Sequence, residues 1–96
     1  MKIKVTEEII RESSALLKRG DRRSRSCPVA LAIRKATGKL CGVSINGGDF
    51  IDSNDHDAGA FRLPVEANDF IRTFDGVSAY DDPLEYVDPF EFELEV

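Results

Sequence analysis

The residues best equipped for chemistry form a basic stretch that runs from Lys18 to Ser26 and leads directly into the apolar run 27–33. Pro28 predicts the start of a helix, because proline is tolerated in a first helical turn. Ser26 or Cys27 would then be the N-cap, and serine is the better capping residue. A helix start presents unpaired N–H groups, which bind anions together with arginine and serine side chains. We therefore predict a phosphate-binding site made of Arg22, Arg23, Ser24, Arg25, Ser26 and Cys27.

Two other interpretations of this stretch stay open. A run of arginines on a loop is also typical of a solvated surface, and the glycine-lysine pattern of a Walker loop is absent. Cys27, beside arginines at a helix start, could be an activated thiol. The only histidine, His56, belongs to a different predicted loop. We therefore favour a packing role for Cys27 and predict no catalytic residues.

Acidic residues gather in two further places. Asp52, Asp55, His56 and Asp57 suggest a metal-binding loop, but their spacing does not fit a calcium loop, so we expect a solvated loop, no metal and no cofactor. The second group is a dense C-terminal run: Asp81, Asp82, Glu85, Asp88, Glu91, Glu93 and Glu95. It is either the solvent face of a strand and its turn, or a mimic of a nucleic-acid backbone.

The length and the charge distribution of the chain limit the classes of protein to which it can belong. The 96 residues predict one domain, without an apolar run long enough to cross a membrane and without a secretory signal at the start. We therefore expect Cys27 and Cys41 to be free thiols in a reducing compartment. The net charge is −5, but residues 1–39 hold 11 Lys and Arg against 4 Asp and Glu, and residues 40–96 hold 2 against 14. Opposite halves can neutralise each other, meet between two copies, or face different partners.

Hydropathy periodicity predicts the elements that carry these residues. Residues 2–5 and 90–96 alternate as half-buried strands, with lysines on the polar face of the first and glutamates on that of the second. We expect these terminal strands to pair. Helices are predicted at 7–18, after the capping residue Thr6, at 27–37, and between Pro64 and Gly76.

The middle of the chain predicts a hairpin. Strands are expected at 40–45 and 49–52 around the turn Asn46-Gly47-Gly48, followed by a polar loop at 53–59 and a short strand at 60–63. Residues 18–25 and 77–83 are predicted loops. The order β-α-α-β-β-β-α-β favours a single α+β domain over residues 1–96, with three helices on a mostly antiparallel sheet of four to five strands.

Several short motifs resemble uncharacterised proteins of bacteriophages and prophages. They are Cys27-Pro28-Val29-Ala30-Leu31-Ala32-Ile33, Leu63-Pro64, Phe70-Ile71, Phe74-Asp75 and Pro89-Phe90-Glu91-Phe92. The resemblance implies a small accessory protein in the host cytoplasm that acts by binding. It carries over no functional residue.

These observations lead to two principal hypotheses. The first is a non-catalytic binding protein that sequesters a small phosphorylated ligand, such as a defence signalling nucleotide, with Tyr80 or Tyr86 stacking on a base. The second is an acidic inhibitor that imitates nucleic acid and blocks a host defence protein. Direct nucleic-acid binding is weaker, because the net charge is negative. We expect a homodimer and no membrane partner.

Overall fold

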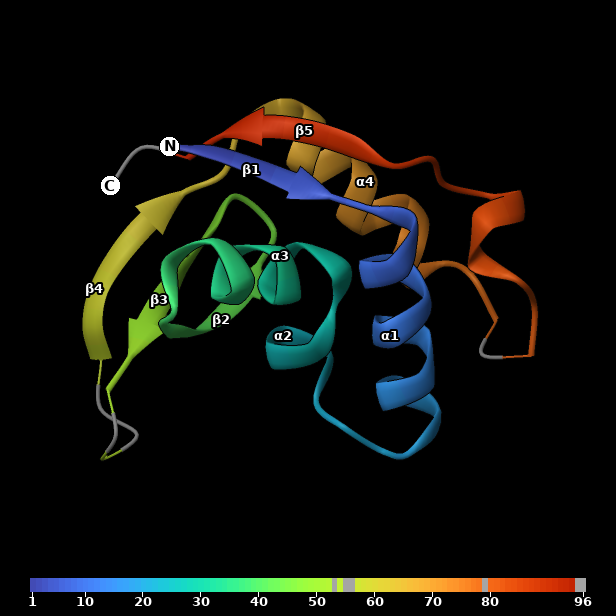
Figure 1. The fold of residues 1–96 in the computed structure, drawn as a ribbon, viewed down its shortest axis with the longest axis horizontal. Coiled ribbons are helices and arrows are strands. Elements are labelled where there is room, and N and C mark those ends of the chain that lie inside the picture. Colours follow the sequence, from blue (N-terminus) through green and yellow to red (C-terminus); the bar gives the residue numbers. More distant parts are fainter. Residues whose placement is uncertain (53, 55–56, 79, 95–96) are drawn as a thin grey trace.

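The computed structural model describes residues 1–52, 54, 57–78 and 80–94, with the backbone alone at residue 57. Its strands and helices confirm the α+β class (Figure 1). The elements are β1 (Lys2–Val5), α1 (Glu7–Lys18), α2 (Arg23–Ser26), α3 (Pro28–Thr37), β2 (Leu40–Ser44), β3 (Gly47–Ile51), β4 (Asp57–Arg62), α4 (Val65–Asp75), the 3-10 turn η1 (Pro83–Glu85) and β5 (Phe90–Glu93).

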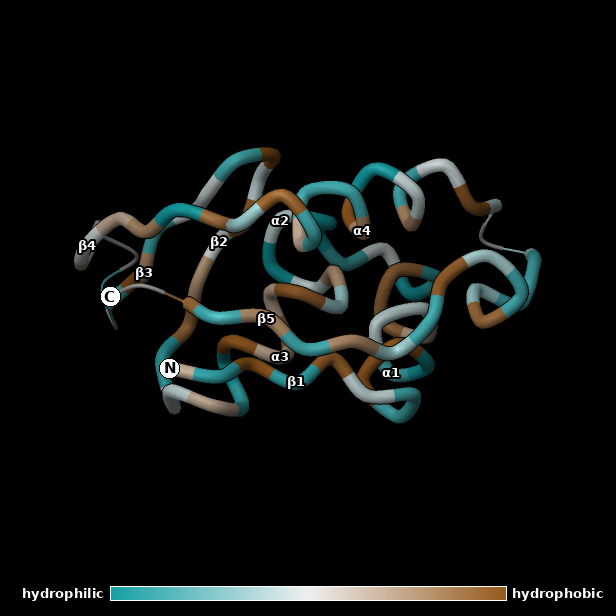
Figure 2. The backbone as a smooth tube through the Cα atoms, turned by 90° about the horizontal axis from the view of Figure 1, so that it is seen from above, coloured by the Kyte–Doolittle hydropathy of each residue, from teal (hydrophilic) through white to brown (hydrophobic). Residues whose placement is uncertain are grey.

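The strands form two antiparallel sheets instead of the one that we expected. One contains β1 and β5, and the other has the order β2-β3-β4. The predicted pairing of the terminal strands is confirmed, with Lys2 opposite Glu93 and Lys4 opposite Glu91. Hydrophilic and hydrophobic residues alternate along both strands (Figure 2), so that each strand turns its hydrophobic side chains inward and its hydrophilic side chains to solvent.

Helix α3 lies between the two sheets and is the centre of the core. It contacts β1, β2 and α1, and Val29, Leu31 and Ile33 have no exposed surface. Its first six residues are all buried, which explains why an apolar run without helical periodicity is nonetheless a helix. Gly38 ends it with φ +73°, a left-handed conformation that favours glycine.

The other two predicted helices are also confirmed. Thr6 caps α1, because its hydroxyl accepts from the N–H of Ile9 at 3.2 Å. Helix α4 buries the predicted stripe, and its Phe70 stacks on Phe90 of β5 with ring centroids 4.7 Å apart. Tertiary aromatic contacts therefore hold α4 against the terminal sheet.

Several predicted elements differ in the structure, including the last strand, which ends at Glu93 and not at residue 96. Residues 23–26 form the short helix α2 instead of a loop, and strand β4 begins at residue 57 instead of 60. In the hairpin, Ser44 pairs with Gly47, so the turn is Ile45-Asn46 and both glycines belong to β3. Asn46 supplies the positive φ of the turn, whereas a Cβ at Gly48 would collide with the carbonyl oxygen of Gly42. Here glycine serves the close approach of two strands.

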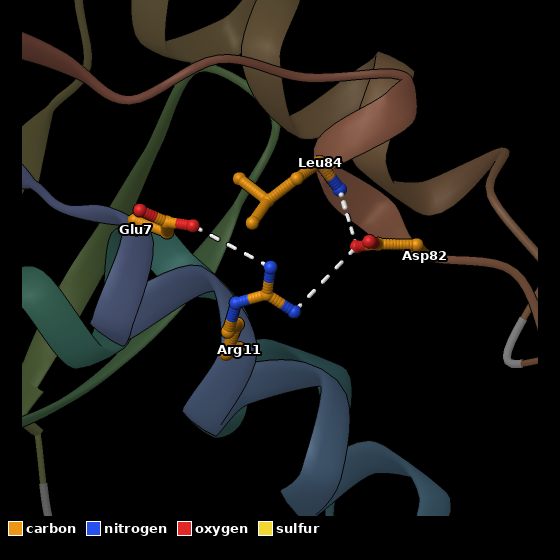
Figure 3. A network of polar contacts seen from close by, with 4 residues as sticks. All are labelled: Glu7, Arg11, Asp82 and Leu84. Atoms are coloured by element: carbon orange, nitrogen blue, oxygen red, sulfur yellow. Dashed lines mark hydrogen bonds and ion pairs between the residues drawn. The ribbon is translucent and has the colours of Figure 1, made fainter.

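An arginine joins the start of the chain to the segment before β5 (Figure 3). Arg11 contacts Glu7 at 3.4 Å and Asp82 at 3.9 Å, and Asp82 accepts from the N–H of Leu84 at 3.0 Å. The predicted loop 77–83 therefore ends in a capped 3-10 turn fixed against α1. None of the helices in the described parts of the chain is long and apolar enough to cross a membrane.

Candidate functional site

The six residues predicted to bind phosphate fall into two groups. Arg22, Arg23 and Ser24 are exposed and Arg25 is half-buried, whereas Ser26 and Cys27 are buried. The cause is the helix α2, which packs against β2 and turns its last residue towards α1 and α3. Arg22, Arg23 and Ser24, which we call the exposed group, are therefore available to solvent. Ser26 and Cys27, the buried group, lie inside the protein.

The buried group makes hydrogen bonds within the protein. The hydroxyl of Ser13, which is fully buried, donates to the carbonyl oxygen of Ser26 at 2.6 Å. The hydroxyl of Ser26 donates to a carboxylate oxygen of Asp21 at 3.3 Å. The N-cap of α3 is Cys27 and not Ser26, because the Cys27 sulfur accepts from the N–H of Ala30 at 3.5 Å. These contacts connect α1, α2 and α3.

Both thiols are buried and protonated at neutral pH. Burial raises the pKa of Cys27 to about 11, more than the N–H groups of Ala30 and Val29 lower it. Burial likewise raises the pKa of Cys41 to about 12, and its thiol lies 3.6 Å from the carbonyl oxygen of Ala30. A nucleophilic cysteine needs a lowered pKa, so these values support the packing role for Cys27.

Two residues of the exposed group, Arg23 and Ser24, border a groove between α2, the β2–β3 hairpin and α4. We call it the Arg23 groove; it has a volume of about 450 Å³ and is lined by Arg23, Ser24, Cys27, Val43, Ser44, Ile45, Ile71 and Asp75. Val43, Ile45 and Ile71 give it an apolar wall, and Arg23, Ser24 and Ser44 give it polar groups. A volume of this size is within the range of small-molecule sites.

One carboxylate in the groove already contacts the arginine. Arg23 donates to Asp75 at 3.3 Å, and roughly half of each side chain is exposed, 49% and 44%. An exposed ion pair of this kind contributes about 0–1 kcal/mol, so an incoming phosphate can take the place of Asp75 at little cost. Asp75 is the last residue of α4, where the helix dipole disfavours a negative charge.

Sequence reasoning missed the wall of the groove. Ile45, Ile71 and Asp75 come from the hairpin turn and from α4, and only tertiary packing brings them beside α2. No local sequence signal marks them. Neither tyrosine that we suggested as a stacking partner lines this groove: Tyr80 borders a hollow beside Lys18, and Tyr86 borders one beside Phe90.

The two acidic features are not equivalent. In the suggested metal loop, Asp52 accepts from the N–H of Asn54 at 2.9 Å, while Asp55, His56 and the Asp57 side chain lie outside the described residues. In the C-terminal run, Glu91 pairs with Lys2 at 3.5 Å and Glu93 with the N-terminal ammonium at 3.3 Å. Glu95 lies outside the described residues. The pairing of β1 with β5 therefore neutralises part of the negative charge of the C-terminal run.

No protein-family model, curated protein or solved structure matches this chain.

Proposed function

We propose that this chain is a non-catalytic binding protein that captures a small phosphorylated ligand of the nucleotide class in the Arg23 groove. The observation that carries the proposal is the position of Arg23 and Ser24 at one side of a groove of about 450 Å³ with an apolar wall. Arginine and hydroxyl donors suit a phosphate, and an apolar wall suits the flat face of a base.

Arg22 and Arg25 add positive charge next to Arg23 and Ser24, the polar side of the Arg23 groove. Arg22 directly precedes α2 and is exposed, and Arg25 follows one helical position after Ser24. In this proposal Arg22 and Arg23 contact phosphate oxygens, Ser24 donates one hydrogen bond, and Arg25 adds positive potential. Ser26 acts by positioning α2 and does not line the groove, while the mostly buried Cys27 caps α3 and forms part of the groove lining.

The resemblance to bacteriophage proteins gives the proposal its context. A small host-cell cytoplasmic protein that binds a defence signalling nucleotide would act by lowering the free concentration of that signal. A homodimer belongs to the same proposal. The mimicry hypothesis receives less support, since Lys2 and the N-terminal ammonium compensate Glu91 and Glu93.

A thermal-shift screen tests the proposal. Purified protein is heated with cyclic nucleotides, ADP-ribose derivatives, nucleoside phosphates and inorganic phosphate. A ligand at about 100 times its Kd stabilises the native state by about 2.7 kcal/mol. For a domain of this size, that raises Tm by roughly ten degrees or more. A large shift with one nucleotide and none with phosphate is expected, and a flat screen would refute the proposal.

A further inference from the structure

A second groove lies on the other side of α4, between this helix and the chain that enters β5. We call it the Phe90 groove; it has a volume of about 350 Å³ and its floor includes Phe70, Tyr86 and Phe90. Phe70 and Phe90 stack with an interplanar angle of 27°, and Phe90 stacks in turn on Phe92. Tyr86 is 54% exposed. Phe90 is half-buried and Phe70 is only 8% exposed, so Tyr86 and Phe90 present most of the aromatic surface to solvent.

The rim of the Phe90 groove is acidic. Glu66 and Asp69 lie one turn apart on α4, and Asp88 lies on the opposite side in the chain that leads to β5. All three are exposed, and none forms an ion pair with another part of the chain that the structure describes. Among the residues that the structure describes, no lysine or arginine lines the groove. These carboxylates differ in this respect from Asp82, Glu91 and Glu93, which have cationic partners.

Charge and shape together select one kind of occupant. The alkyl stem of an arginine or lysine packs on aromatic rings, and its cationic head is attracted to ring faces and to carboxylates. An anionic ligand would meet three carboxylates of its own sign. The net charge of −5 further attracts a cationic partner from a distance.

We propose that the Phe90 groove docks an arginine- or lysine-bearing segment of a partner protein. The partner's apolar side chains and alkyl stems lie on Tyr86 and Phe90, and its cationic heads contact the rim. This site is separate from the Arg23 groove and does not depend on the proposed function.

Fluorescence anisotropy tests the proposal with a labelled short peptide in which arginine and leucine alternate. The groove variant is Glu66→Gln/Asp69→Asn/Asp88→Asn. The control variant Glu8→Gln/Asp49→Asn/Asp81→Asn removes the same charge from exposed positions that do not line the groove. The groove variant should bind about tenfold more weakly, equivalent to ~1.4 kcal/mol. The control variant should bind within about twofold of the unsubstituted protein, and a peptide with citrulline in place of arginine should not bind.

The proposal would be overturned if the unsubstituted protein bound no arginine peptide, or if the groove variant bound it as well as the unsubstituted protein does. Equal weakening in both variants would also overturn it, because attraction to net charge alone requires that result. Tyr86→Ser examines the floor separately: it should weaken peptide binding without lowering Tm, and unchanged affinity would contradict the aromatic contact. Sedimentation distinguishes a second copy, because a dimer that the groove variant dissociates would assign the groove to self-association instead.

Discussion

The segment from Arg22 to Cys27 contains two groups of polar residues with different surroundings. Arg22, Arg23 and Ser24 face solvent, the last two beside the Arg23 groove, while Ser26 and Cys27 are buried and have partners within the protein. The packing of α2 explains the difference, since this helix turns its last residue towards α1 and α3 and leaves its first two residues, Arg23 and Ser24, exposed to solvent. A helix start rich in donors can therefore be structural on its inner side and available for binding on its outer side.

The largest expected effect comes from reversing charge in the exposed group. Arg22→Glu/Arg23→Glu should weaken binding of the phosphorylated ligand by at least about a hundredfold, or ~2.7 kcal/mol, because attraction becomes repulsion. Isothermal titration calorimetry measures this change. Lys39→Glu/Arg62→Glu alters the net charge equally at exposed positions outside the Arg23 groove and should have little effect. Equal losses in both variants would mean that only net charge matters.

The two buried cysteines, Cys27 and Cys41, should make the free energy of unfolding depend on pH in the alkaline range. An unfolded cysteine ionises near its ordinary pKa of 9.0, while the folded pKa is about 11 for Cys27 and about 12 for Cys41. Their stabilising contribution is therefore fully present below pH 9 and is lost as pH rises towards 11 and 12. Urea unfolding at about pH 10 should show a loss on the order of 2 kcal/mol relative to about pH 8. Cys27→Ser/Cys41→Ser should reduce this loss, and an identical pH dependence in the variant would contradict the assignment.

The hydrogen bond between α1 and α2 should matter for stability and not for binding. Ser13→Ala removes the hydroxyl that donates to the buried carbonyl of Ser26. It should lower the free energy of unfolding by about 1–2 kcal/mol. Ser14→Ala is the matched control, because its side chain is only half-buried, and a change within about 0.5 kcal/mol is expected. Chemical denaturation measures the free energy of unfolding of both variants. Equal losses would show that the buried hydrogen bond of Ser13 contributes no more to stability than the half-buried hydroxyl of Ser14.

The smallest expected effect concerns the ion pair in the groove. Asp75→Asn removes the carboxylate that now contacts Arg23. Ligand affinity should rise by up to about fivefold, since the exposed pair contributes under about 1 kcal/mol. Glu66→Gln, on the same helix but in the Phe90 groove, should leave this affinity unchanged. A loss of affinity in Asp75→Asn would mean that Asp75 binds the ligand directly.

The sequence predicted those parts of the fold in which local pattern and tertiary environment agree. Alternation in residues 2–5 and 90–96 was enough to predict the β1–β5 pair, and apolar spacing was enough for α1 and α4. The division into two sheets was not predictable, because it depends on α3 lying between them. Helix α2 was missed because polar residues without periodicity give no helical signal.

The candidate site was partly predictable for the same reason. Arg23 and Ser24 were identified from residue type, and they do border a groove. The apolar wall from Ile45 and Ile71 depends on long-range packing, so no local pattern indicates it. Ser26 is buried where its carbonyl oxygen accepts a hydrogen bond from Ser13 of α1. Sequence reasoning considers the two helices separately, so it does not predict this contact.

The most direct test of the central claim is a ¹H–¹⁵N correlation titration with the nucleotide that gives the largest thermal shift. We expect the amide resonances of 22–25, 43–45 and 71–75 to move together and to saturate. The resonances of β1, β5 and the Phe90 groove should stay in place. Saturable shifts confined to the β1–β5 pair or to the Phe90 groove, with residues 22–25 unmoved, would contradict the assignment of the ligand to the Arg23 groove.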